Sequence, residues 1–166
     1  MNDIAIYRAQ VITVSTRSFK GVWEDTSGPA IVEKLKSWGL DSPMPIIVPD
    51  GEAVKDALQS AVATGFHLII TNGGTGLSPT DLTPEMTKQV IERDAPGIAA
   101  LIREYGLAKG VVNSSLSRAV AGVAQKSLII NFPGSFGGVN DALKAIEPIL
   151  LHALEQIAGS DHLRRG

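Results

Sequence analysis

The sequence predicts an α/β fold: a three-layer sandwich around a mainly parallel sheet that carries an antiparallel edge. Short, apolar, β-branched runs alternate with stretches whose apolar residues recur at helical spacing, and this alternation is typical of a parallel sheet with crossover helices. A hairpin-like pair of apolar runs then fills residues 118–132 and turns at Gln125-Lys126, which indicates the antiparallel edge. The length of 166 residues suits a single domain over residues 1–166.

The first half of the chain alternates strands and helices. Residues 10–16, "QVITVST", are short and β-branched, as expected of a buried strand. Residues 27–39 and 52–65 carry apolar side chains at helical spacing, and each stretch ends on glycine, a common helix stop. Residues 45–50 and 67–72 are apolar and strand-like.

The second half is expected to contain three more helices besides the hairpin. The helix over 83–93 is predicted to begin with Thr83 as its N-cap, followed by a proline in its first turn. A further helix is expected over about residues 97–106. The last helix, residues 137–159, is amphipathic, and Pro148 is expected to bend or split it.

Composition excludes several classes of function. The net charge of −2 offers no basic surface for nucleic acid or an anionic membrane. The absence of cysteine excludes disulfides, thiolate nucleophiles and zinc-thiolate sites. His67, His152 and His162 lack paired metal spacing, and we expect them to be structural or exposed to solvent. No signal peptide or membrane span is recognisable, so the protein is expected to be cytoplasmic.

Polar or glycine-rich sequence follows each predicted parallel strand. In open parallel sheets, ligands bind at the carboxyl ends of the strands. We therefore expect these segments to converge on one crevice, although polar, glycine-rich loops are common without any ligand. The strand ends carry Ser15, Asp50, the loop Gly73, Gly74, Thr75 and Gly76, and the segment Asn131, Pro133 and Gly134.

The loop within "TNGGTGLSPTDLTPE", residues 71–85, is the most unusual of these segments. Glycines let successive backbone N–H groups form an anion-binding nest, which suits a phosphate. The P-loop pattern fails because Leu77 and Ser78 follow Gly76 in place of Lys-Ser/Thr, and the dinucleotide-binding pattern fails at Pro79. A purely structural turn remains the alternative.

Asp50 and Asp81 are the candidate metal ligands. They follow adjacent strands, and a magnesium ion prefers carboxylates, waters and phosphate oxygens. The alternatives are that Asp81 only stabilises the start of the next helix and that Asp50 is a turn residue before Gly51.

Together, these motifs resemble the MogA/MoaB-type proteins of molybdenum cofactor synthesis, and most closely the actinobacterial MogA-like members. The resemblance covers residues 8–160, and its most specific part is the order of the elements. Thr80 stands where many members carry arginine. The matching segments are "STRSFKGVWEDTSGP" (15–29), "VPDG" (48–51), "TNGGTGLSPTDLTPE", "SSLSRAVAG" (114–122) and "LIINFPGS" (128–135).

The resemblance implies a molybdopterin adenylyltransferase, which joins ATP and molybdopterin with Mg²⁺ and releases pyrophosphate. It also implies a homotrimer and a possible hand-over to a molybdate-inserting protein. The alternatives are a non-catalytic molybdopterin-binding or scaffold module and, against the LSR element at 116–118, a nucleotide-pyrophosphate hydrolase of the CinA type. The implied roles are catalysis and metal binding for Asp50 and Asp81, nucleotide binding for Ser15, Gly73, Gly74, Thr75 and Gly76, and molybdopterin binding for Ser117, Arg118, Asn131, Pro133 and Gly134.

Overall fold

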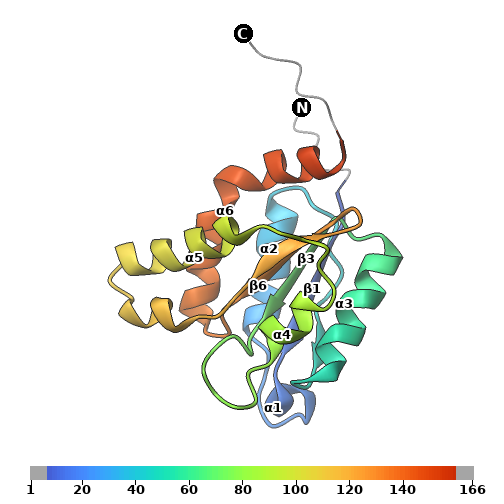
Figure 1. Ribbon diagram of the computed structural model, residues 1–166. Helices are drawn as coiled ribbons and strands as arrows, with labels where there is room; N and C mark the ends of the chain where they lie inside the picture. Colours follow the sequence, from blue (N-terminus) through green and yellow to red (C-terminus); the bar gives the residue numbers. More distant parts are fainter. Residues whose placement is uncertain (1–6, 160–166) are drawn as a thin grey trace.

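The computed structural model describes residues 7–159 and contains a six-stranded sheet (Figure 1). The strand order is β2-β1-β3-β6-β5-β4. The first four strands in this order are mutually parallel, and β5 is antiparallel to both of its neighbours, β6 and β4, so the predicted fold class is confirmed. The strands are β1 (Ala9–Val14), β2 (Ile46–Val48), β3 (Leu68–Asn72), β4 (Arg93–Asp94), β5 (Ala121–Ala124) and β6 (Ser127–Phe132).

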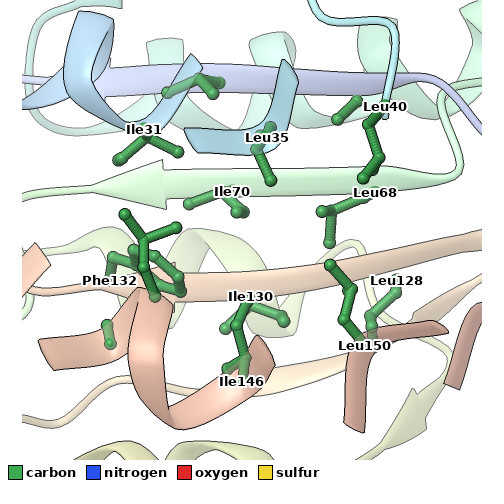
Figure 2. Packing of buried hydrophobic residues seen from close by; sticks show 14 of the residues in the cluster. Ile31, Leu35, Leu40, Leu68, Ile70, Leu128, Ile130, Phe132, Ile146 and Leu150 are labelled. Atoms are coloured by element: carbon green, nitrogen blue, oxygen red, sulfur yellow. The ribbon is translucent and has the colours of Figure 1, made fainter. Parts of the chain in front are cut away.

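Helices cover both faces of the sheet. One face packs against α2 (Ser27–Ser37), α5 (Pro96–Ala108) and α6 (Phe136–Ile157), and the other packs against α3 (Glu52–Thr64) and α4 (Thr83–Lys88). Figure 2 shows the first of these layers, in which Ile31 and Leu35 of α2 and Ile146 of α6 lie over the central strands.

The alternation of side chains along each central strand supplies both cores. In β3, Ile70 belongs to the core under α2 and α6, whereas its neighbour Ile69 belongs to the core under α3. Ile130 and Ile129 divide in the same way in β6. Because both faces of these strands are covered, their central residues are apolar in succession rather than alternating with polar residues, and Thr71, Asn72 and Asn131 follow toward the carboxyl ends.

Several predicted element bounds were wrong. The helix expected over 83–93 ends at Lys88, and β4 was missed because a two-residue strand has no periodicity to detect. Two further short elements were missed, α1 (Thr16–Phe19) and a 3₁₀ turn, η2 (Val112–Leu116). Leu82, not Thr83, occupies the N-cap position of α4, because the Thr83 side chain is buried beneath the preceding loop.

Pro148 does not split the last helix. α6 runs unbroken from Phe136 to Ile157, and its ribbon changes direction between its orange and red parts (Figure 1). Pro148 and Lys144, the residue whose carbonyl group a proline at position 148 cannot pair with, are both exposed. Among residues 7–159, no helix has the length and apolar character needed to cross a membrane.

Candidate active site

The four parallel strands bring their carboxyl ends to the same edge of the sheet. Val14 of β1 pairs with Val48 of β2, and Asn72 at the end of β3 pairs with Thr13 of β1 and Phe132 of β6. The segments that follow these strands are therefore neighbours, as the sequence predicted.

A pocket of about 630 Å³ opens at this edge. It lies between the glycine loop after β3, the segment after β6, and η2 with α5. Among its lining residues are seven of the predicted site residues: Gly74, Thr75, Gly76, Asp81, Ser117, Pro133 and Gly134. Five predicted site residues lie outside the lining: Ser15, Asp50, Gly73, Arg118 and Asn131.

The first two glycines of the loop are fixed by packing. Gly73 has φ of +102°, and a Cβ atom there would lie 2.3 Å from the Val14 carbonyl oxygen. Gly74 has φ of +67°, and a Cβ atom there would lie 2.3 Å from Thr83 Oγ1. Other residues rarely adopt this backbone conformation. The loop is therefore pressed against the end of β1 and the start of α4, which places Thr75 and Gly76 along the pocket.

Asp81 faces the pocket from the far end of the loop. Its Oδ2 accepts a hydrogen bond of 3.1 Å from the Ser78 N–H and lies close to Gly76. The carboxylate thus closes the turn and borders the pocket at the same time. Thr80, on the exposed side of this turn, pairs its hydroxyl with that of Ser78 at 3.3 Å.

Asp50 lies at the other end of the glycine loop. Its Oδ2 accepts a 2.7 Å hydrogen bond from the Thr16 hydroxyl, and its N–H donates to the same Thr16 Oγ1 at 3.2 Å. Its Oδ1 lies beside Gly74, 3.1 Å from the position a Cβ atom would take. The two predicted aspartates therefore both lie against the glycine loop, Asp50 next to Gly74 and Asp81 next to Gly76.

The side-chain oxygen atoms around the loop are of the type that binds a magnesium ion together with a nucleotide. Among residues 7–159, no group of three or more His, Cys, Asp or Glu side chains is arranged to hold a metal ion. Magnesium is commonly bound by one or two carboxylates, waters and substrate phosphates. Thr83 Oγ1, beside Gly74, is buried without a hydrogen-bond partner in the described part of the chain, so it offers a further oxygen near Asp50.

Asn131 lies outside the pocket lining, so its predicted contact with molybdopterin stays a prediction. Its side chain is 0% exposed and fully hydrogen-bonded. Nδ2 donates to the hydroxyls of Thr71 and Thr87 at 2.9 Å each, and Oδ1 accepts from the Val120 N–H at 3.1 Å. Asn131 therefore ties β6 to β3 and α4 beneath the pocket, and no group on it is available to a ligand.

Arg118 also lies outside the pocket lining, and its guanidinium bonds to the glycine loop. Nε donates to the Gly76 carbonyl oxygen at 2.7 Å, Nη2 donates to the Asp81 carbonyl oxygen at 2.5 Å, and the group forms an ion pair with Glu85. The hydrogen bond from Arg118 lowers the pKa of Glu85, and the same bond raises the pKa of Arg118. The predicted contact of Arg118 with molybdopterin stays a prediction, and the contacts in the structure are with the loop.

Two charged residues near the site escaped the sequence analysis. Arg103 of α5 lines the pocket and donates to the carbonyl oxygen of Ala119 at 3.0 Å. Asp25 accepts hydrogen bonds from the Thr13 hydroxyl at 2.7 Å and the Gly28 N–H at 2.9 Å. Arg103 lies in a helix, so only tertiary packing reveals that it faces the pocket. Asp25 lies two residues before Ser27-Gly28, and this acidic residue was a detectable signal in the sequence.

The start of α6 adds positive potential to the pocket. Gly137 and Gly138, in its first turn, line the pocket, and the N-cap residue Ser135 accepts from the Gly138 N–H at 3.2 Å. A helix N-terminus favours anions. With Arg103, it makes this side of the pocket suitable for a phosphorylated ligand.

Comparison with known proteins shows the family to which the chain belongs. A family model described as "Probable molybdopterin binding domain" matches residues 10–152. The molybdopterin adenylyltransferase of Helicobacter pylori (strain J99) is 36% identical over 154 residues, which cover 90% of this chain and 87% of that protein.

Solved structures match over nearly the whole chain. A structure of MogA is 50% identical with a TM-score of 0.88, and the match covers 90% of this chain and 99% of that one. The molybdopterin biosynthesis Mog protein from Mycobacterium ulcerans is 49% identical with a TM-score of 0.87, covering 91% and 99%. The chain therefore belongs to the MogA/MoaB family of molybdenum cofactor biosynthesis proteins.

Proposed function

We propose that this protein is a molybdopterin adenylyltransferase that uses ATP and Mg²⁺. The observation that carries the proposal is one pocket lined by both sets of predicted binding residues. Gly74, Thr75, Gly76 and Asp81 of the nucleotide side lie there together with Ser117, Pro133 and Gly134 of the molybdopterin side. A shared pocket of this kind would bring a nucleotide and a pterin phosphate together.

The chemistry requires no general base. The terminal phosphate of molybdopterin attacks the α-phosphorus of ATP, forming a new P–O bond, and the bond from that phosphorus to the bridging oxygen breaks to release pyrophosphate. A phosphate monoester has a second pKa near 6, so the nucleophile is largely ionised at neutral pH. The absence of histidine and cysteine from the pocket lining is consistent with such a reaction.

The residues must instead position two phosphates that repel each other. The N–H groups of the glycine loop, the start of α6 and the Arg103 guanidinium supply positive potential. Asp50 and Asp81 would hold Mg²⁺ together with the nucleotide phosphates, and the ion would neutralise charge between the substrates. A nucleotide contact of Ser15 remains part of the proposal; in the structure its Oγ caps α1 by accepting from the Ser18 N–H.

We also include a homotrimer in the proposal. Exposed apolar surface supports it, since a shallow depression between α5 and α6 is lined by Ile98, Leu101 and Ile149. A sedimentation experiment would give a mass three times the chain mass of 17.5 kDa. A monomer at micromolar concentration would remove this part of the proposal. Hand-over of the product to a molybdate-inserting protein would follow the reaction.

The test is to mix the purified protein with molybdopterin, ATP and Mg²⁺ and to measure adenylylated molybdopterin and pyrophosphate. We expect the two products in equal amounts, and none when molybdopterin is omitted. Binding of molybdopterin without turnover would indicate a scaffold module. Pyrophosphate release from ATP without molybdopterin would indicate a hydrolase.

A further inference from the structure

We propose that Arg118 and Glu85 form a clamp that positions the glycine loop and Asp81, and that Arg118 acts through the loop rather than by contact with a substrate. The clamp is defined here as the Arg118 guanidinium, the Glu85 carboxylate, and the carbonyl oxygens of Gly76 and Asp81. The catalytic part of this inference rests on the proposed adenylyl transfer, whereas its structural part does not.

The clamp joins both ends of the exposed segment 77–80. Arg118 donates from Nε to Gly76, which precedes the segment, and from Nη2 to Asp81, which follows it. The Arg118 backbone N–H donates to the Thr75 carbonyl oxygen at 2.8 Å. One residue therefore fixes the start and the end of the segment that carries the pocket carboxylate.

Residues 77–80 have little else to hold them. All four are exposed. In the described part of the chain, the hydrogen bonds shown for Ser78 and Thr80 run within the loop, to each other and to Asp81. Without Arg118, the carbonyl groups of Gly76 and Asp81 would lose the hydrogen bonds that tie both ends of the segment to the chain just before β5. Mobility of Asp81 is therefore the expected consequence.

Glu85 makes the clamp stable. It lies in the first turn of α4, and its two carboxylate oxygens accept from Nη1 and Nη2 of Arg118. The ion pair offsets the guanidinium charge and fixes the orientation of its plane, so that Nε and Nη2 point at the two carbonyl groups. A lysine ammonium lacks this planar fork and cannot make all of these contacts at once.

Arg118 reaches the pocket only through its neighbours. Ser117, Gly76 and Asp81 line the pocket, and Arg118 does not. A residue that binds a substrate directly would be needed regardless of Glu85. A clamp residue, in contrast, should lose its effect once Glu85 is removed, because the two side chains act as one unit.

The experiment is a double-mutant cycle with Arg118→Gln, Glu85→Gln and the double variant, each checked for folding by thermal melting. Amide hydrogen exchange of residues 76–82 is measured first, without any substrate. We expect faster exchange in both single variants, to a similar extent, and no further increase in the double variant. Glu147→Gln is the matched control, since Glu147 of α6 pairs with Lys34 of α2 at 3.8 Å and neither residue lines the pocket.

Kinetics then test the catalytic part. We expect kcat to fall by about 10- to 100-fold in each single variant, because displacement of a positioned group by about 1 Å can cost this much. The KM for molybdopterin should change less than kcat, and the double variant should be no worse than the single variants. Arg118→Lys should restore thermal stability without restoring the slow exchange of the loop.

Two results would overturn the clamp. One is wild-type exchange and kinetics in Glu85→Gln together with weakened molybdopterin binding in Arg118→Gln, which would make Arg118 a substrate contact. The other is additive effects of the two substitutions.

If the wild-type protein shows no adenylyl transfer, the proposed function fails, and the exchange data still decide whether the clamp exists. If Arg118→Gln does not fold, Glu85→Gln and Arg118→Lys provide the same comparison.

Discussion

Gly73 meets the end of β1 so closely that a Cβ atom on it would lie 2.3 Å from the carbonyl oxygen of Val14. The obstacle is backbone in the central part of the sheet, so it cannot rotate away as a flexible side chain would. The glycine loop is therefore held against the sheet as well as open toward the pocket.

Gly73→Ala should destabilise the protein strongly. Alanine at φ of +102° is strained, and the clash with Val14 adds to that strain, so we expect a loss of about 2–4 kcal/mol in the free energy of unfolding. Urea denaturation measures it. Gly97→Ala is the control, since nothing lies within 4 Å of its Cβ position in the first turn of α5, and it should be neutral or slightly stabilising. Equal midpoints for wild type and Gly73→Ala would contradict the packing described for this loop.

Asn131→Ala should affect stability rather than substrate affinity. The substitution removes the partner of the Val120 N–H and of the Thr71 hydroxyl, whereas the Thr87 hydroxyl keeps its bond to the Thr83 carbonyl oxygen; each group left unpaired costs about 1–3 kcal/mol. Asn113→Ala, at an exposed residue of the pocket lining, should leave the unfolding free energy within about 0.5 kcal/mol of wild type. Weakened molybdopterin binding in a fully stable Asn131→Ala would restore the role predicted from the sequence.

Ser117→Ala should weaken molybdopterin binding more than ATP binding. Ser117 lines the pocket, and its Oγ accepts from the Ala119 N–H at 3.3 Å. Loss of a hydrogen bond to a charged phosphate is worth about 1.5–3 kcal/mol, or roughly 10- to 150-fold in affinity. Calorimetric titration with each substrate separately gives the comparison. Equal losses of affinity for both substrates would refute the assignment of Ser117 to the molybdopterin side of the pocket.

His67 should make stability depend on pH. Burial, followed by the charges of Arg8 and Lys126, lowers the pKa of His67, and its neutral Nδ1 accepts from the Arg8 N–H at 3.1 Å. The unfolded chain therefore binds more protons than the folded protein between the folded pKa and the ordinary value of about 6.5. Stability is complete above about pH 6.5 and falls as the pH drops through this window. Thermal melting from pH 7.5 to 5 should show this slope in wild type and a smaller slope in His67→Gln; identical slopes would show that His67 does not contribute.

The sheet, and the edge at which its parallel strands end, could be predicted from the sequence because each central strand has a strong local signal. Ile69-Ile70 and Ile129-Ile130 are buried on both faces, so their strands are continuous apolar runs. β4 and α1 are too short to have a period. The proximity of Arg103 to the pocket depends on how α5 packs, which no local pattern encodes.

The site residues divide in the same way. Asp81 and the glycines were predicted from a local motif, and the structure places Asp81, Gly74 and Gly76 at the pocket. Asn131 and Arg118 were assigned to the ligand by resemblance, because they belong to motifs that match the family. Proximity in sequence cannot show whether a side chain points into the pocket or beneath it, and here Asn131 is buried and Arg118 holds the loop.

The central claim is that the glycine loop and Asp81 form the reacting side of a pocket that joins two phosphates. Its most direct test is the rate of adenylylated molybdopterin formation by wild type and Asp81→Asn over a Mg²⁺ titration. Asparagine retains an oxygen to accept from the Ser78 N–H, so the loop should keep its fold. Asp56→Asn, on the exposed face of α3, controls for the loss of one negative charge.

We expect wild type and Asp56→Asn to form product at the same rate. Asp81→Asn should melt like wild type yet lose Mg²⁺-dependent product formation by about 100-fold or more, since metal and positioning contributions of several kcal/mol are removed together. Product formation by Asp81→Asn at the wild-type rate would contradict the account.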